Sequence, residues 1–204
     1  MKSARQEILD KLKNAIHQTP EEPDFETPVY HSVNEPLDLT FKENLEKVHG
    51  TARLFTHRNK LFTELKKYLS DFGVDNIICR EKKIQDQLRL FDIPFSEDSE
   101  LPDSIEIGIT GCEYLIAHTG TVMVSSAQKG GRQLFVYPPV HVIIASRRQI
   151  VSYLEDAYNA IQKKYKENLP SQIILITGPS RTADIEKTLV MGAHGPKELN
   201  VFIV

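Results

Sequence analysis

From residue 105 onward, short apolar runs alternate with glycine-containing turns, and this feature constrains the fold more than any other. The runs cover residues 105–109, 121–124, 140–145, 173–176 and 201–204. Continuous Val and Ile runs of this length are typical of strands buried on both faces of a sheet. Between the third and fourth runs, residues 150–161 carry apolar side chains at helical spacing. This order of elements predicts an α/β fold, with a mostly parallel sheet flanked by helices.

The N-terminal segment is predicted to lie outside this domain. Ser3 and Gln6 can form a capping box at the start of a helix. The apolar stripe of that helix consists of Ile8, Leu9, Leu12 and Ile16. Residues 19–36 then contain four prolines, five acidic residues and no Lys or Arg, which is typical of an extended linker. We therefore divide the chain into a helix with linker, residues 1–36, and a domain, residues 37–204. The stripe packs either on its own domain or against another subunit, as in a homo-oligomer.

Residues 37–103 show helical patterns interrupted by one short strand. Thr40 and Glu43 form a second candidate capping box, and Gly50 is expected to end that helix. The next helix is predicted to pass through Leu61 and Phe72 and to end at Gly73. The remaining predicted elements are a strand, a helix and a loop, at residues 74–79, 81–91 and 94–103.

Composition excludes several classes of protein. The formal net charge of −3 argues against a general binder of nucleic acid or of anionic membranes. No apolar run approaches 18 residues, so no membrane span is expected, and the charged first residues predict no signal peptide. The sequence therefore predicts a cytoplasmic protein. Cys79 and Cys112 form no C-x-x-C pair, and the seven histidines show no metal-binding spacing. We expect buried, reduced cysteines and no metal or redox cofactor bound by this chain alone.

Three Thr-Gly steps follow or flank predicted strands, where ligands bind in open parallel sheets. They are Thr110-Gly111, Thr119-Gly120-Thr121 and Thr177-Gly178. Glycine lets the backbone approach a ligand closely, and threonine supplies a hydroxyl group. Each step is therefore a candidate ligand-binding loop, and the three are expected to converge on one pocket. The alternative is that they are ordinary turns between strands and helices.

The stretch from Thr177 to Glu186 is the most specific of the candidates. It leaves a predicted strand and is expected to open a helix, with Ser180 or Thr182 as the N-cap. Free backbone N–H groups at a helix start bind anions, and Arg181 adds a planar clamp for phosphate or carboxylate. The alternative role for Arg181 is a buried ion pair.

Three further side chains are candidates. His194 lies in a turn between two glycines, and His118 precedes the second Thr-Gly step, so each is a candidate acid, base or polar contact. Both histidines can instead cap nearby backbone carbonyls. Arg132 belongs to the basic loop 129–132, which is either a mobile lid over an anion or a solvated turn.

These motifs occur in a familiar order. Residues 177–186, residues 192–196 and the last apolar run resemble the C-terminal signature of the lactate utilization protein C family, which carries the LUD domain. The steps at Thr110 and Thr119 and the segment 138–141 resemble its other motifs. The resemblance covers residues 41–204, most strongly after residue 105.

The resemblance implies a fold related to the NagB/RpiA/CoA-transferase group. It also implies a role in oxidising L-lactate to pyruvate, with partner proteins that carry the iron–sulfur clusters. The family pattern has an acidic residue where this chain has His118, so a catalytic role of that acid would be altered or absent here. The alternative is a stand-alone enzyme or binder that acts on a CoA ester, a folate or a sugar phosphate, as in fold relatives.

Overall fold

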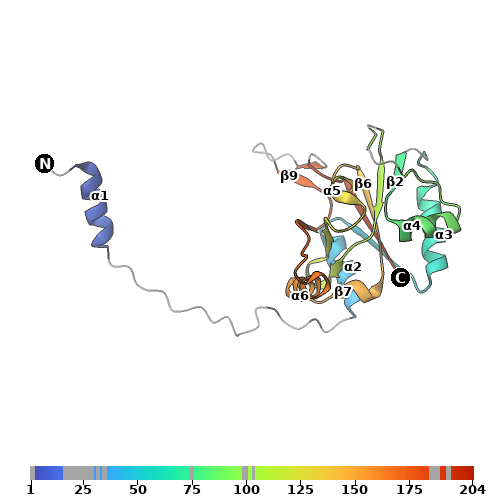
Figure 1. The fold of residues 1–204 in the computed structure, drawn as a ribbon, viewed down its shortest axis with the longest axis horizontal. Helices are drawn as coiled ribbons and strands as arrows, with labels where there is room; N and C mark the ends of the chain where they lie inside the picture. Colours follow the sequence, from blue (N-terminus) through green and yellow to red (C-terminus); the bar gives the residue numbers. More distant parts are fainter. Residues whose placement is uncertain are drawn as a thin grey trace. The chain divides into compact units, whose positions relative to one another are not determined.

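The computed structural model describes residues 3–15, 30, 33, 36–73, 76–97, 101–102, 104–183, 189–191 and 194–204 (Figure 1). The chain forms two compact units, Met1–Ser32 and Val33–Val204. In the described part of the chain, no helix is long and apolar enough to cross a membrane.

The first unit contains helix α1 (Ala4–Lys13), which begins with the predicted capping box. The Ser3 hydroxyl accepts a hydrogen bond from the Gln6 N–H group, and the Gln6 side chain accepts one from the Ser3 N–H group. No residue of α1 is buried, and Ile8 and Leu12 are more than half exposed. Ile16 and most of the predicted linker lie outside the described residues.

The second unit is built on a five-stranded sheet in which every pairing is parallel. Its strands, in spatial order, are β1 (Thr51–Leu54), β11 (Glu198–Ile203), β6 (Val140–Ala145), β3 (Ile107–Thr110) and β2 (Ile77–Cys79). The predicted parallel sheet with flanking helices is therefore confirmed, and the predicted strand at 140–145 has the observed bounds. Val74 and Asp75, at the start of the predicted strand 74–79, lie outside the described residues.

A second sheet corrects part of the prediction. It contains, in order, β7 (Ile150–Val151), β4 (Tyr114–Ile116), β5 (Thr121–Ser125) and β8 (Ile173–Ile176). The runs at 121–124 and 173–176 were expected in the parallel sheet, but β5 pairs antiparallel with both β4 and β8. The reason is that one short 3₁₀ turn, η2 (Ala117–Thr119), joins β4 to β5, whereas a parallel connection needs a crossover of a dozen or more residues.

Among its described residues, the second unit contains five further elements that are α-helices. They are α2 (Leu37–Lys47), α3 (Arg58–Leu69), α4 (Lys82–Leu90), α5 (Gly131–Leu134) and α6 (Leu154–Tyr165). The capping box predicted at Thr40 is wrong, because α2 begins after Pro36 and the Thr40 hydroxyl donates to the Pro36 carbonyl. Ile150 and Val151, predicted as helix, form β7 because they pair in parallel with β4. A short 3₁₀ helix, η3 (Arg147–Gln149), precedes them.

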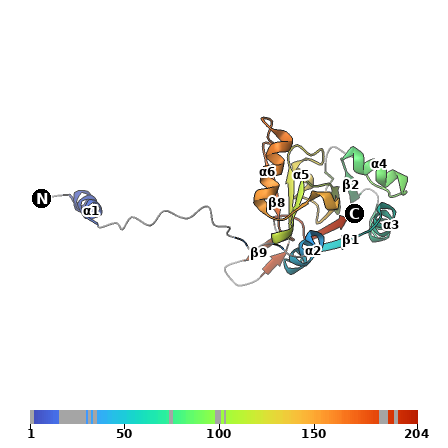
Figure 2. The same cartoon turned by 90° about the horizontal axis from the view of Figure 1, so that it is seen from below.

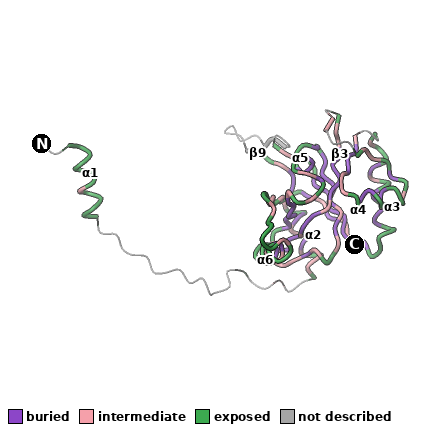
Figure 3. Tube along the Cα trace, in the orientation of Figure 1, coloured by how far each residue is buried: buried purple, intermediate pink, exposed green. Residues whose placement is uncertain are grey.

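Figure 2 shows α3 and α4 on one side of the strands and α6 on the other, and side chains that alternate along the strands hold these layers together. Val142 and Phe202 join a buried cluster with α3 and α4 on one face of the parallel sheet. Their neighbours Ile143 and Val201 point the other way and pack against α2 and the second sheet. The outer face of the second sheet is covered by α6. The buried segments in Figure 3 accordingly follow the strands.

A buried polar pair lies on the face of the parallel sheet opposite α3 and α4. Thr110 and His141 are both 0% exposed, and the Thr110 hydroxyl lies 2.8 Å from His141 Nε2. The hydroxyl donates to the Gly111 carbonyl, so Nε2 carries the proton and donates to Thr110. His141 Nδ1 has no hydrogen-bond partner among the described residues. Burial lowers the pKa of His141 from 6.5 to about 3.

This histidine makes stability pH-dependent. In the unfolded chain His141 takes up a proton near its ordinary pKa of 6.5, whereas in the folded protein it stays neutral down to about 3. Acid therefore favours the unfolded state, and His141 lowers the free energy of unfolding by up to about 1.4 kcal/mol per pH unit below 6.5. Urea unfolding of wild type and His141→Gln between about pH 7 and 5 measures this slope. We expect a shallower slope in the variant than in wild type. If the free energy of unfolding depended on pH equally in wild type and His141→Gln, this prediction would be contradicted.

Removal of the first unit is expected to leave the second unit folded. No residue of α1 is buried, so deletion of Met1–Ser32 exposes no described core. The free energy of unfolding should change by less than about 1 kcal/mol in chemical unfolding. Sedimentation of both chains shows whether α1 contributes to association. Loss of cooperative unfolding would mean that α1 belongs to the core.

Candidate functional site

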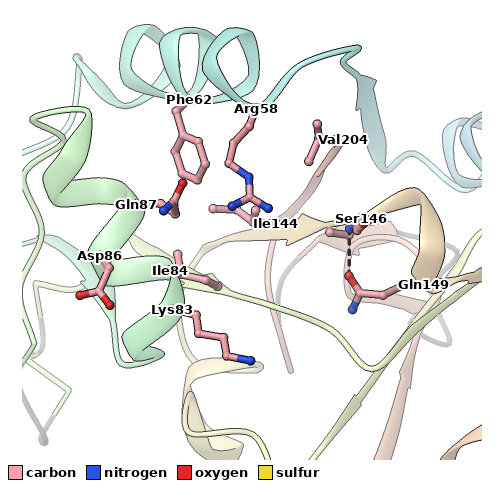
Figure 4. A pocket seen from close by; sticks show the side chains of 11 residues that line it. Arg58, Phe62, Lys83, Ile84, Asp86, Gln87, Ile144, Ser146, Gln149 and Val204 are labelled. Carbon is pink, nitrogen blue, oxygen red and sulfur yellow. Dashed lines mark hydrogen bonds between the residues drawn. The ribbon is translucent and has the colours of Figure 1, made fainter.

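The parallel strands end at a common edge, and a cavity opens there. Its volume is about 470 Å³, and it lies between the ends of β6 and β11 and the first turns of α3 and α4 (Figure 4). Eleven residues line it: Arg58, Phe62, Lys83, Ile84, Asp86, Gln87, Ile144, Ala145, Ser146, Gln149 and Val204. The carboxyl edge of the sheet is where ligands bind in open α/β folds, so this cavity is the candidate site.

Two cationic side chains face the cavity. Arg58 is the first residue of α3, and Lys83 is the second residue of α4. Figure 4 shows both extending from their helices toward the space beside β6. Among the described residues, neither side chain forms a salt bridge or a hydrogen bond. The carboxylate of Asp86, also in the lining, pairs instead with Lys82 at 3.2 Å and Arg89 at 3.3 Å.

The two helix starts carry the opposite charge from the usual one. The first turns of α3 and α4 contain no acidic residue, and neither N-cap side chain bonds to its helix. Carboxylates are favoured at this positive end of a helix, and cations are disfavoured there. Arg58 and Lys83 therefore add positive charge where N–H groups are already free, and a bound anion would compensate for both.

A second charged group lies at the ends of β2 and β3. Glu81 is the N-cap residue of α4, but its carboxylate accepts a hydrogen bond from the Gly111 N–H group at 2.8 Å. Burial raises the pKa of Glu81, with the nearby Glu113 adding to the effect. The environment of Glu81 therefore shifts its equilibrium toward the protonated form, as in carboxyl groups that act as general acids.

Glu113 remains ionised although it is 3% exposed. Burial opposes its charge, but hydrogen bonds from Lys164 (2.6 Å), Ser125 (2.6 Å) and Tyr165 (2.8 Å) outweigh burial and lower the pKa of Glu113. Gln149, in the cavity wall, donates to the Cys112 carbonyl at 2.6 Å. This bond connects the cavity to the 111–113 loop.

The predicted threonine loops lie in two places rather than one. The Thr121 hydroxyl oxygen lies 2.7 Å from that of Thr119 and 2.8 Å from that of Thr177, so these loops meet at the start of β5 and the end of β8. Thr110 belongs to the buried pair with His141, and Gly111 binds Glu81. The separation follows from the second sheet, which removes β5 and β8 from the parallel edge.

Gly120 and Gly178 let two of these loops approach α2 closely. Both have positive φ angles, 63° and 81°. A Cβ atom at Gly120 would collide with the Leu45 backbone nitrogen, and one at Gly178 with the Val48 carbonyl. The Asn44 side chain donates to the carbonyls of Ala117 at 2.9 Å and His118 at 3.0 Å, which fixes the same contact. These glycines therefore have a packing role, whether or not a ligand binds nearby.

The helix predicted to open at Ser180 or Thr182 is not formed. Residues Arg181–Ala183 form strand β9, which pairs antiparallel with β10 (Leu189–Met191). Cross-strand pairing here overrides the local capping pattern. The Arg181 guanidinium donates to the Val48 carbonyl at 3.4 Å, just beyond the C-terminal end of α2, where a cation is favoured. Asp184 and Glu186 lie outside the described residues.

The other candidates are dispersed. His118 is half-buried. Its backbone N–H group donates to the Ser152 carbonyl at 3.0 Å, and its ring lies 5.4 Å from that of Tyr153. His194 is exposed, and Ser180 is half-buried with its N–H group on the Pro196 carbonyl. Arg132 donates to the Ser171 hydroxyl at 2.5 Å. Their roles in ligand binding remain predictions.

The two cysteines are buried and unpaired, as predicted. Burial raises the pKa of Cys79 to about 12, and that of Cys112 is raised as well, so both thiols stay protonated. Among the described residues, no three His, Cys, Asp or Glu side chains come together as metal ligands.

Sequence reasoning missed Arg58, Lys83 and Glu81. The available signal was the basic residue in the first turn of each helix that follows a parallel strand. It was overlooked because Arg and Lys are common on exposed helix faces and these positions match no motif.

Fold and cavity together define an α/β protein with a candidate ligand site at the carboxyl edge of a parallel sheet. Residues 39–204 match the LUD domain model, and the chain belongs to the LUD domain family. The predicted resemblance to lactate utilization protein C is also confirmed. The chain is 36% identical to lactate utilization protein C 1 of Bacillus mycoides, over 84% of this chain and 74% of that protein. It is 28% identical to lactate utilization protein C of Macrococcus caseolyticus, over 97% of this chain and 77% of that protein.

A solved structure shares the fold. A DUF162 family protein from Deinococcus radiodurans superposes with a TM-score of 0.62, over 82% of this chain and 96% of that chain. The two sequences are 19% identical, so the likeness concerns the fold alone.

The contact between Gly120 and α2 can be tested by substitution. Gly120→Ala places a side chain in the left-handed region and against the α2 backbone, so it should lower the free energy of unfolding by more than about 2 kcal/mol. Gly73→Ala is the matched control, because its Cβ would make an ordinary contact with Asn76 and should change stability by less than about 1 kcal/mol. Equal effects of the two substitutions in urea unfolding would show that the approach to α2 is not tight.

Proposed function

We propose that this protein takes part in lactate utilization and binds an anionic small molecule in the carboxyl-edge cavity. The observation that carries the proposal is the pair of cations Arg58 and Lys83 at the starts of two helices, neither of which has an ion-pair or hydrogen-bond partner among the described residues. The names of the relatives, lactate utilization protein C, support the metabolic role.

The two cations have different parts in binding. The planar guanidinium of Arg58 matches a carboxylate or phosphate with two parallel hydrogen bonds, and Lys83 acts as a point charge. A hydrogen bond to a charged group contributes about 1.5–3 kcal/mol, so loss of either cation weakens binding by about tenfold or more.

Glu81 is the proposed proton-exchanging group beside this site. It immediately precedes α4, which supplies Lys83, and its pKa is raised by burial. A carboxyl group of this kind can release or accept a proton as a hydroxyl group is oxidised or a carbonyl group is reduced. The oxidation of lactate to pyruvate releases two electrons and two protons. We propose that iron–sulfur partner proteins accept the electrons and that the protons are released to water. The support for these partners is the family resemblance, together with two cysteines that are buried and widely separated in sequence.

Growth on L-lactate tests the role. A host that lacks the gene should fail to grow on L-lactate as sole carbon source and should recover with the wild-type gene. The double variant Arg58→Gln/Lys83→Gln should not restore growth. Lys66→Gln should restore it, because the Lys66 side chain is exposed in the last turn of α3 and lies outside the lining.

Purification from the same host tests the partners. The tagged wild-type chain should bring down proteins whose absorption shows iron–sulfur clusters. Unimpaired growth on L-lactate without the gene would contradict the metabolic role. Full complementation by the double variant would contradict the assignment of the cavity.

A further inference from the structure

We infer that the ligand of the carboxyl-edge cavity is larger than lactate: an organic anion whose charged group lies between Arg58 and Lys83 and whose apolar body packs on Phe62, Ile84 and Ile144. The inference rests on the proposed function in one respect, namely that this cavity is the ligand site.

The first argument is volume. The cavity measures about 470 Å³, within the range of about 300–1,000 Å³ that holds drug-sized ligands. Lactate has three carbons and would leave most of this space to water. A ligand that uses the cavity must therefore carry a body in addition to its charged group.

The second argument is the chemistry of the wall. Phe62, Ile84 and Ile144 give the cavity a partly apolar surface. These side chains belong to or pack on the α3–α4 core cluster, and the Phe62 ring stacks on Phe91 at 5.0 Å. The apolar surface is thus fixed in place before any ligand arrives, which reduces the ordering cost of binding.

The third argument is that two polar side chains of the wall, Gln149 and Asp86, already have partners. The Gln149 side chain accepts from the Ser146 N–H group at 2.8 Å and donates to the Cys112 carbonyl at 2.6 Å. Asp86 is neutralised by Lys82 and Arg89. Among the described residues of the wall, the charged groups left for a ligand are the two cations, so the wall favours an anion attached to an apolar group.

Three probes separate these contributions: naphthyl phosphate, inorganic phosphate and naphthol. Isothermal titration calorimetry on the full chain should give naphthyl phosphate an affinity at least tenfold higher than inorganic phosphate or L-lactate. Naphthol, which lacks the charge, should bind at least tenfold more weakly than naphthyl phosphate. Arg58→Gln and Lys83→Gln should each weaken naphthyl phosphate binding by about tenfold or more.

Two further variants act as controls. Lys66→Gln removes an exposed cation in the last turn of α3, outside the lining, and should leave naphthyl phosphate binding unchanged. Gln87→Trp places a bulky side chain in the wall on the outer part of α4 and should block naphthyl phosphate while thermal unfolding shows an intact fold. If both variants behave in this way, the results support the carboxyl-edge cavity as the binding site for naphthyl phosphate.

The overturning results are distinct. Equal affinity for naphthyl phosphate and inorganic phosphate would mean that the apolar wall is not recognised. Tighter binding of L-lactate than of naphthyl phosphate would mean that the site recognises a small carboxylate and not a larger anion. Unchanged binding in both Arg58→Gln and Gln87→Trp would place the ligand elsewhere. Each readout is independent of growth on L-lactate, so failure of the metabolic role and failure of this inference are separate.

Discussion

Parallel pairing of β11 with both β1 and β6 is the constraint on which the rest of the structure depends. It directs the carboxyl ends of the strands to one edge and sends the following helices, α3 and α4, back along one face. Both helices therefore begin at that edge, which brings Arg58 and Lys83 together although they lie on different helices. The other face is left for α2 and the second sheet, whose side chains close the core.

Much of the fold could be predicted from the sequence, because continuous apolar runs locate strands, although β8 is only partly buried. The strands at Val140–Ala145 and Ile173–Ile176 have the predicted bounds. The sequence pattern does not distinguish which sheet a run joins, since a run buried on both faces looks the same in a parallel and an antiparallel sheet. The assignment of β5 and β8 therefore failed, and the predicted common pocket of the threonine loops failed with it.

The candidate site was less predictable than the fold, for a physical reason. The Thr-Gly steps and the residues around Arg181 were predicted to bind a ligand. In the structure, Gly120 and Gly178 allow close packing against α2. Arg58 and Lys83 are significant for two reasons. Neither side chain has an ion-pair or hydrogen-bond partner among the described residues, and the two helices that carry them begin at the same edge of the sheet. Both are properties of the three-dimensional structure. The helix dipole disfavours a basic residue in the first turn of a helix. A basic residue at this position in a helix that follows a parallel strand can therefore be used as a sequence signal for an anion site.

The position of β11 inside the sheet has a consequence for how the protein is made. Thr51 of β1 pairs with Asn200 of β11, about 150 residues further along the chain. During synthesis at about 5–20 residues per second, β1 waits on the order of ten seconds for this partner, and β6 lacks a neighbour on the same side. The sheet edge that holds the cavity therefore forms after translation has passed residue 200, not progressively from the N-terminal side. Until then the apolar faces of β1 and β6 are available to chaperones and to other nascent chains.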